Sequence, residues 1–332
     1  MALADQAVPK TRSKVRRRLI SLVMPVYNEE ANVERAYAAL TAIFKTLPHY
    51  DLEFIFTDNH SEDATFDRLA ALAKMDDRIK VIRFNRNYGF QRSLLTAYLQ
   101  ASGDAAIQID CDLQDPPELL PKFIELWEQG HDVVVGLRRR RQEHALLTLA
   151  RRSFYMILSR ISDDQITRDA GDFRLVDRLV IDQLKRLNDS NPFVRGVVSS
   201  FAAREVGIPY NRVQRMHGRS KFSFRKLVGF AVDGIVGHSI LPLRLASYSG
   251  FVISLITFVI SLFYIIGALF LGQSWPGGFA TLVVVSLFGI SLNAIFLGII
   301  GEYLSRIYQQ VRYRPLVIVE RTINITGGGA KE

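Results

Sequence analysis

The chain has 332 residues, of which 48% are apolar and 23% charged, and its formal net charge at neutral pH is +9. With 22 glycines, 11 prolines and one cysteine, the composition excludes collagen-like, disordered and disulfide-stapled proteins. A single cysteine has no partner within the chain, which favours a reducing compartment. The length suffices for a full enzyme domain and a smaller unit.

Residues 1–18 form a basic N-terminal tail that ends in three consecutive arginines. The apolar run at 19–26 resembles the core of a signal peptide in its position. It is short, however, it contains Pro25, and it continues into polar residues without a cleavage site. We therefore expect a buried strand at 19–26 and a tail that is either disordered or held at an anionic membrane surface.

Apolar runs then alternate with amphipathic stretches. The pattern predicts strands at 19–26, 52–57, 79–84, 105–110 and 132–136, with helices at about 29–47, 63–74, 90–102 and 117–129. Such alternation is typical of parallel strands joined by right-handed helical crossovers. The sequence therefore predicts an α/β domain with a Rossmann-like, mostly parallel sheet, which we place at residues 19–221.

Polar residues follow three of the predicted strands. Tyr27 and Glu29 come after the first strand, Asp58 after the second, and an acidic segment at 110–115 after the fourth. Ligands of parallel sheets bind beyond the carboxyl ends of the strands. Carboxylates gathered there repel one another unless a cation or a hydrogen-bonding ligand lies among them. We therefore expect the functional site at this edge.

The acidic segment is the candidate metal site. Alternate residues of an extended chain face the same side, so Asp110, Asp112 and Gln114 can present oxygens together. Oxygen donors of this kind suit Mg²⁺ or Mn²⁺, which also bind phosphate oxygens. A solvated acidic turn is the alternative, and Asp115, placed before two prolines, fits a helix cap. We expect Cys111 to point into the core.

The C-terminal third has the composition of a membrane segment. From Leu245 to Gly301 it contains no Asp, Glu, Lys, Arg or His. Within a membrane unit at 244–305, two helices at about 246–271 and 279–300 are long enough to cross about 30 Å of hydrocarbon. A buried hairpin of a soluble protein is the alternative.

Basic residues flank both outer ends of this hairpin. The positive-inside rule therefore places the N-terminus and a C-terminal tail at 306–332 in the cytoplasm. Before the hairpin, a juxtamembrane region at 222–243 carries apolar residues at helical spacing behind basic ones. This pattern fits an interfacial helix on the inner leaflet, and equally a helix packed on the sheet.

Two groups of basic residues lie outside the predicted strands. Four arginines begin at Arg138, Arg151 and Arg152 follow, and a second group spans 212–226. Such runs are usually solvated surface, and at this net charge nucleic-acid binding is the first alternative. The chain has no nucleic-acid-binding motif and has a membrane segment, so we expect no nucleic acid partner. We expect the arginines to neutralise phosphates of a substrate or of lipid head groups.

Five ordered motifs resemble those of the polyprenyl-phosphate glycosyltransferases of glycosyltransferase family 2, which include dolichol-phosphate mannose synthases and bacterial undecaprenyl-phosphate (bactoprenol) glucosyltransferases. The resemblance covers about residues 19–305 and implies a GT-A fold. An Asn59-His60 turn looks closest to the bacterial glucosyl-type members. The motifs are Met24-Pro25-Val26-Tyr27-Asn28-Glu29-Glu30, Asp58-x-x-Ser61-x-Asp63, Asp110-Cys111-Asp112-Leu113-Gln114-Asp115-Pro116-Pro117, Asp169-Ala170-Gly171-Asp172-Phe173-Arg174-Leu175 and Arg215-Met216-His217-Gly218-Arg219-Ser220-Lys221.

The resemblance also implies roles for individual residues on the sugar-donor side. The nucleotide would be held by Pro25, Tyr27, Glu29, Asp58, Asp110 and, through the helix start behind it, Gly89. The metal on the diphosphate would be held by Asp110, Asp112 and Gln114. Catalytic roles would fall to Asp112, Arg215, Lys221 and Asp169.

The acceptor side is less defined. Arg215 and Lys221 would reach the diphosphate or the acceptor phosphate, and Asp169 either orients the acceptor or the sugar or caps a turn. Family members often carry a Ser-Arg pair before Phe-Tyr, whereas this chain has Arg-Arg-Ser there. Which residue binds the acceptor phosphate therefore stays open among Arg138, Arg151, Arg152 and Ser153.

The implied reaction is the inverting transfer of a sugar, glucose from UDP-glucose, to a polyprenyl phosphate at the cytoplasmic leaflet of a bacterial inner membrane. GDP-mannose and UDP-linked amino sugars stay open as donors. A processive polysaccharide synthase would need a Gln-x-x-Arg-Trp motif, which is absent. A non-catalytic membrane scaffold with the same fold is the alternative of another class. Small residues in the second helix favour a homo-oligomer, which we expect to be a tetramer.

Overall fold

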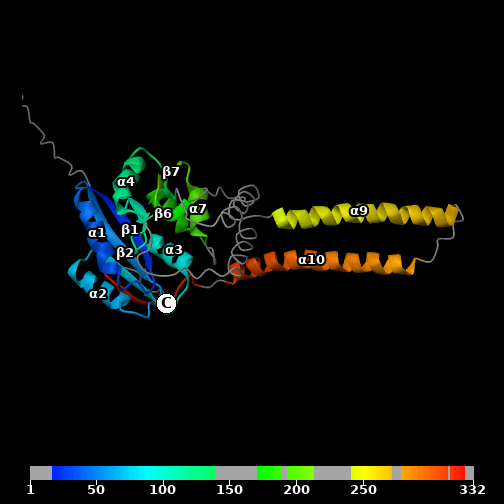
Figure 1. Cartoon of the computed structure of the whole chain (residues 1–332), viewed down its shortest axis with the longest axis horizontal. Coiled ribbons are helices and arrows are strands. Elements are labelled where there is room, and N and C mark those ends of the chain that lie inside the picture. The colour runs from blue at the N-terminus through cyan, green and yellow to red at the C-terminus, as the bar shows by residue number, and fades with distance from the viewer. Residues whose placement is uncertain are drawn as a thin grey trace, which may run out of the picture.

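The computed structural model describes residues 17–138, 170–187, 193–212, 241–270, 278–312 and 315–325. It contains a layered α/β domain from which two long helices extend side by side (Figure 1). Residues 222–240 of the predicted juxtamembrane region at 222–243, the hairpin loop and most of the N-terminal tail lie outside the described residues.

Eight strands form one mixed sheet in the order β7-β5-β6-β4-β1-β2-β3-β8. Strands β6 and β8 run antiparallel to their neighbours, and the other pairings are parallel, which confirms the mostly parallel sheet. We did not predict β6, β7 or β8. The strands are β1 Arg18–Val26, β2 Tyr50–Asp58, β3 Ile79–Phe84, β4 Ala105–Gln108, β5 Val133–Arg138, β6 Ala170–Asp177, β7 Glu205–Tyr210 and β8 Val319–Ile323.

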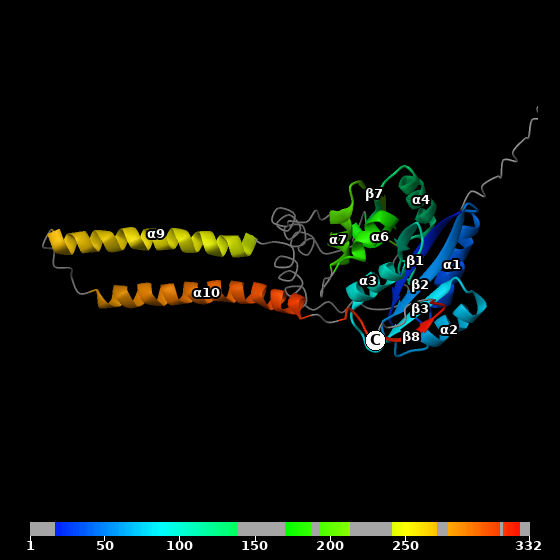
Figure 2. The same ribbon diagram turned by 180° about the vertical axis from the view of Figure 1, so that it is seen from behind.

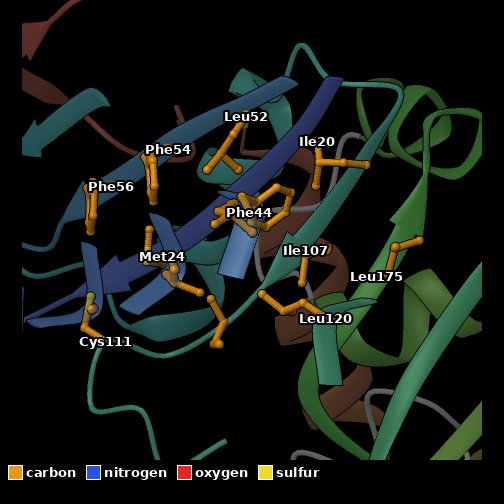
Figure 3. Packing of buried hydrophobic residues seen from close by; sticks show 14 of the residues in the cluster. Ile20, Met24, Phe44, Leu52, Phe54, Phe56, Ile107, Cys111, Leu120 and Leu175 are labelled. Carbon is orange, nitrogen blue, oxygen red and sulfur yellow. The ribbon is translucent and has the colours of Figure 1, made fainter. Parts of the chain in front are cut away.

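Helices cover both faces of the sheet because its strands are apolar on both sides. In β1 and β2, Leu22 and Phe54 belong to one core cluster, while their chain neighbours Val23 and Ile55 belong to the other. Figure 3 shows the first cluster, in which Phe44 packs near Leu52 and Phe54. The helices of this face are α1 Val33–Lys45, α2 Thr65–Met75 and α4 Leu120–Glu128, and those of the other are α3 Phe90–Gln100, α6 Arg178–Leu184 and α7 Val194–Phe201.

The predicted elements up to residue 138 are present, with one correction that bears on the site. The sequence pattern extends the fourth strand to 110, whereas β4 ends at Gln108. The acidic segment is therefore a loop from its first residue. A short 3₁₀ turn, η1 Pro117–Leu119, joins this loop to α4.

The two long helices are α9 Leu241–Phe270 and α10 Phe279–Val311. Figure 2 shows them from behind, extended from the α/β domain. In the described part of the chain one window, Phe288–Ser305, is long and apolar enough to cross a bilayer, and α9 carries a shorter apolar stretch, Leu243–Thr257. Large apolar side chains such as Phe251 and Leu297 are exposed along both helices.

Candidate functional site

The turns after β1 and β2 interlock at the carboxyl edge of the sheet. Val26 and Asp58 are register partners, so both strands end at the same level. The Asn28 N–H donates to the Ser61 hydroxyl at 3.0 Å, and the Glu29 N–H donates to Thr65 Oγ1 at 2.8 Å. These bonds place two of the predicted nucleotide-binding segments side by side.

The β1 turn presents its predicted residues to solvent. Asn28 adopts a left-handed conformation with φ of 55°, which turns the chain sharply out of the strand. Tyr27 is exposed, and Pro25 and Glu29 are partly exposed. The Glu29 carboxylate accepts a hydrogen bond from the Asn32 amide at 2.6 Å.

Asp58, in contrast, is completely buried. Its carboxylate accepts a hydrogen bond from the Ser61 N–H at 2.9 Å and pairs with the Arg83 guanidinium at 2.8 Å. Arg83 also donates to the Ser61 carbonyl at 3.2 Å. Asp58 thus orders the whole turn that follows β2.

The loop before α3 is tied to the same turn. The Tyr88 N–H donates to Asn59 Oδ1 at 2.8 Å, and the Gly89 N–H donates to Asn87 Oδ1 at 2.9 Å. Gly89 has φ of 86°, a conformation that favours glycine, and it directly precedes the first residue of α3. The start of α3 therefore lies at the predicted nucleotide edge.

Asp110 lies among several carboxylates. Burial, followed by the charges of Asp115, Asp112 and Asp172, raises the pKa of Asp110 to about 7, and the charge of Arg212 opposes the shift. The Arg212 guanidinium lies 3.7 Å from the Asp110 carboxylate. Crowded acidic groups of this kind are the environment that a bound cation stabilises.

The rest of the acidic loop is ordered by its own backbone. The Gln114 N–H donates to Asp112 Oδ1 at 3.2 Å, and Leu113 between them has φ of 53°. Asp112 is partly exposed, whereas the Gln114 side chain is buried. Cys111 lies in the core cluster, as predicted, and burial raises the pKa of its thiol (Figure 3).

Asp115 is not the helix cap that the sequence indicates. No side chain caps η1. Asp115 instead is buried and accepts a hydrogen bond from the Tyr210 hydroxyl, and it pairs with Arg212 at 3.2 Å and Arg138 at 3.5 Å. Burial makes these three partners necessary, because an unpaired carboxylate would be costly.

Arg138, a predicted acceptor-phosphate residue, takes part in the same group of contacts. Its guanidinium also donates to the Tyr210 hydroxyl at 3.2 Å, and its side chain is largely buried. Arg138 therefore lies beside the acidic loop, bound to Asp115. The other candidates for the acceptor phosphate and catalysis, Arg151, Arg152, Ser153, Asp169, Arg215 and Lys221, lie outside the described residues.

Two further residues join the site from β6 and from the segment after β7. The negative charge of Asp172 helps to raise the pKa of Asp110, and its carboxylate pairs with Arg195 of α7 at 2.6 Å. Arg212 lies between Asp110 and Asp115. The sequence indicated only that Asp172 belongs to a motif and Arg212 to a basic run. The pairing of β6 with β4 and of β7 with β5 brings both residues close to the acidic loop.

The oxygen donors of the acidic loop fit a metal that substrate phosphates help to hold. Among the described residues, no group of three or more His, Cys, Asp or Glu side chains is arranged to hold an ion. Asp110 and Asp112 remain as a carboxylate pair with partial exposure. Mg²⁺ is commonly held by one or two carboxylates together with substrate phosphates and water. Within the described part of the chain, the residues fit such a shared site and do not form a complete protein cage.

Comparison with known proteins gives the family. The profile of glycosyl transferase family 2 matches residues 21–185. An uncharacterized glycosyltransferase of Bacillus subtilis is 37% identical over 92% of this chain and 94% of its own. A prophage-derived bactoprenol glucosyl transferase of Shigella flexneri is 36% identical over 91% and 98%. A solved mannosyltransferase from Pyrobaculum calidifontis is 15% identical over 90% and 87%, with a TM-score of 0.46. The chain therefore belongs to glycosyl transferase family 2, and it has the α/β fold that its motifs predict.

Proposed function

We propose that this protein transfers a sugar from a nucleotide diphosphate to the phosphate of a membrane polyprenyl phosphate, with UDP-glucose as the donor and undecaprenyl phosphate as the acceptor. The observation that carries the proposal is the similarity to bactoprenol glucosyl transferases over nearly the full length of both chains. This length includes the segment with the two long helices as well as the α/β domain.

The donor would bind at the carboxyl edge of the sheet. Pro25, Tyr27, Glu29 and Asp58 would hold the nucleoside, and the start of α3 behind Gly89 would offer N–H groups to the phosphates. The interlocked turns after β1 and β2 support this assignment, because they join the segments that carry these residues into one ordered edge, with Tyr27 exposed and Asp58 buried behind it.

Asp110, Asp112 and the oxygen of Gln114 would hold Mg²⁺ or Mn²⁺ against the diphosphate. When bound, this ion would supply Lewis-acid stabilisation of charge on the leaving group. The crowding of Asp110 by Asp112, Asp115 and Asp172 supports the assignment, since a cation relieves that repulsion. Arg215 and Lys221 would add positive charge near the diphosphate.

The acceptor needs little activation by the protein. A phosphate monoester has its second pKa near 6 and is therefore largely dianionic at neutral pH. Its oxygen would attack the anomeric carbon as the bond to the nucleoside diphosphate breaks, and this single displacement inverts that centre. Asp169 would orient the acceptor or the sugar, and the residue that binds the acceptor phosphate would be one or more of Arg138, Arg151, Arg152 and Ser153.

The membrane would bring the acceptor to this site. We propose that α9 and α10 both cross a bacterial inner membrane, with the α/β domain and both termini in the cytoplasm and with a homotetramer as the assembly. The apolar window in α10, the apolar stretch in α9 and the arginines beyond both outer ends support this topology.

The test uses the purified full-length chain in lipid with undecaprenyl phosphate and either UDP-glucose, GDP-mannose or UDP-linked amino sugars. The proposal expects a lipid-linked product from UDP-glucose, identified by mass, and a loss of product in excess chelator. Product from GDP-mannose alone would assign the other donor. Nucleotide binding without transfer to any lipid phosphate would support a scaffold and contradict the proposal.

A further inference from the structure

The C-terminal strand β8 lies beside the turn that follows β2, although the two segments are far apart in the sequence. It lies beside β3 (Figure 2) and pairs antiparallel with it, so that Thr322 is the register partner of Ile82 and Arg321 that of Arg83. The Asn324 side chain fastens its end by donating to the carbonyls of Ala73 at 2.8 Å and Ile79 at 3.0 Å. The segment that follows α10 is therefore built into the sheet.

Glu320 on this strand approaches the residues that order the turn. Its carboxylate lies 3.5 Å from Arg83 Nε and 3.6 Å from His60 Nδ1. The opposite side of the Arg83 guanidinium pairs with Asp58 and the Ser61 carbonyl, as described above. The guanidinium carbon also lies 4.8 Å from the centre of the Phe66 ring. Arg83 thus contacts β8, α2 and the 58–61 turn at once.

This arrangement solves a physical problem at Asp58. A fully buried carboxylate needs a partner, and the planar fork of an arginine provides one with defined direction. Arginine is a long flexible side chain, so each contact on a different edge of the guanidinium further fixes its plane. Glu320 adds the contact on the Nε edge, while the two terminal nitrogens bind Asp58 and the Ser61 carbonyl.

We propose that Arg83 and Glu320 are positioning residues for the nucleoside part of the sugar donor. Glu320 holds the plane of Arg83, and Arg83 holds the Asp58 carboxylate and the 58–61 turn in place. The inference rests on the proposed function, which assigns the nucleoside to this edge. It makes the strand after the long helices a part of the donor site, although neither residue touches the substrate.

The test compares Glu320→Gln, which removes the charge and keeps the volume, with Thr322→Ala on the same strand as the control. Glu320 and Arg83 line a surface hollow of about 490 Å³, in which an amide of the same size as the carboxylate fits without a clash. Thr322 is exposed and pairs with β3 through its backbone. Arg83→Lys keeps the charge and removes the fork.

The full-length enzyme is assayed with UDP-glucose and undecaprenyl phosphate. Loss of one charged contact predicts a rise of about three- to tenfold in KM for UDP-glucose in Glu320→Gln, with kcat and the KM for the lipid within about twofold. Arg83→Lys raises the KM for UDP-glucose by more than about tenfold, because a lysine lacks the planar guanidinium that binds Asp58 and the Ser61 carbonyl together. Thr322→Ala leaves all three values unchanged.

A second readout separates positioning from general damage. UDP should inhibit Glu320→Gln less well than wild type by the same factor, while inhibition by inorganic diphosphate, which has no nucleoside, stays constant. A wild-type KM in Glu320→Gln, or equal weakening of both inhibitors, overturns the inference. Failure of the proposed function is a different result, in which the wild-type chain itself neither transfers glucose nor binds UDP.

Discussion

Replacing Tyr210 by phenylalanine tests whether the buried Asp115 network stabilises the domain. The Tyr210 hydroxyl donates to Asp115, which is 1% exposed, and accepts a hydrogen bond from Arg138 at 3.2 Å. The substitution removes both bonds and leaves the ring, which packs against Phe173 at 5.8 Å between centroids. The substitution therefore changes only the contribution of these hydrogen bonds to the free energy of unfolding.

The expected loss follows from these contacts. A hydrogen bond to a charged group contributes about 1.5–3 kcal/mol. Arg138 and Arg212 still pair with Asp115 in the variant, so we expect the lower part of that range, about 1.5–2 kcal/mol. At about 2–4 °C per kcal/mol for a domain of this size, Tm falls by about 3–8 °C.

The assay is thermal unfolding of the full-length protein in detergent, with Tyr50→Phe as the matched control. Tyr50 also donates its hydroxyl to a carboxylate, that of Glu128 at 2.8 Å, but this pair is exposed. Exposed contacts contribute about 0–1 kcal/mol, so its Tm should change by less than about 4 °C and by less than that of Tyr210→Phe. Equal shifts in the two variants, or no shift in Tyr210→Phe, would refute the reasoning.

Three other predictions concern the metal site, pH and the core. Asp112→Asn should lower metal-dependent transfer by at least about a hundredfold, since several kcal/mol of stabilisation is lost, with an unchanged circular dichroism spectrum; unchanged turnover would contradict the metal assignment. Burial opposes ionisation of Glu53, but hydrogen bonds from Lys80, Ser102 and Ser21 outweigh it and lower its pKa below 4.5. The stabilisation from Glu53 is therefore complete above pH 4.5 and is lost as the pH falls through the lowered value, so Glu53→Gln should flatten the decline of Tm in acid, and an unchanged decline would contradict this. Phe123→Ala should cost about 3–5 kcal/mol by opening a cavity beside Phe173, whereas Phe201→Ala, at an exposed ring, should change Tm little; similar shifts would refute the cavity argument.

Strand and helix positions up to residue 138 were predictable because each depends on a local pattern. Apolar runs bounded by polar turns marked β1, β2 and β3. The same pattern made β4 too long. Ile109 is buried and its N–H still donates to the Val23 carbonyl at 3.3 Å, but the strand ends at Gln108. An apolar side chain at a strand end does not reveal where the regular ladder of hydrogen bonds stops.

Strand β6 was hidden by its polar residues. Arg174 in the middle of the strand is 2% exposed, and it donates to the carbonyls of Gly171 and Arg195. An arginine in a sequence indicates surface, because burial of its charge is costly unless specific acceptors surround it. Those acceptors come from the start of the same strand and from α7, which no local pattern connects.

The local sequence by itself determined that an α/β domain with polar residues at its strand ends precedes a long apolar segment, and it marked Tyr27, Asp58 and Asp112 as residues of one edge. Apolar periodicity and strand order act over short distances, so they are visible in the chain. Only the tertiary structure decided that Asp115 is a buried ion-pair partner and not a cap, and that Glu320 contacts Arg83. Ion pairs form between charged side chains that the folded chain brings close together. Glu320 and Arg83 are far apart in the sequence and become neighbours because β8 pairs with β3.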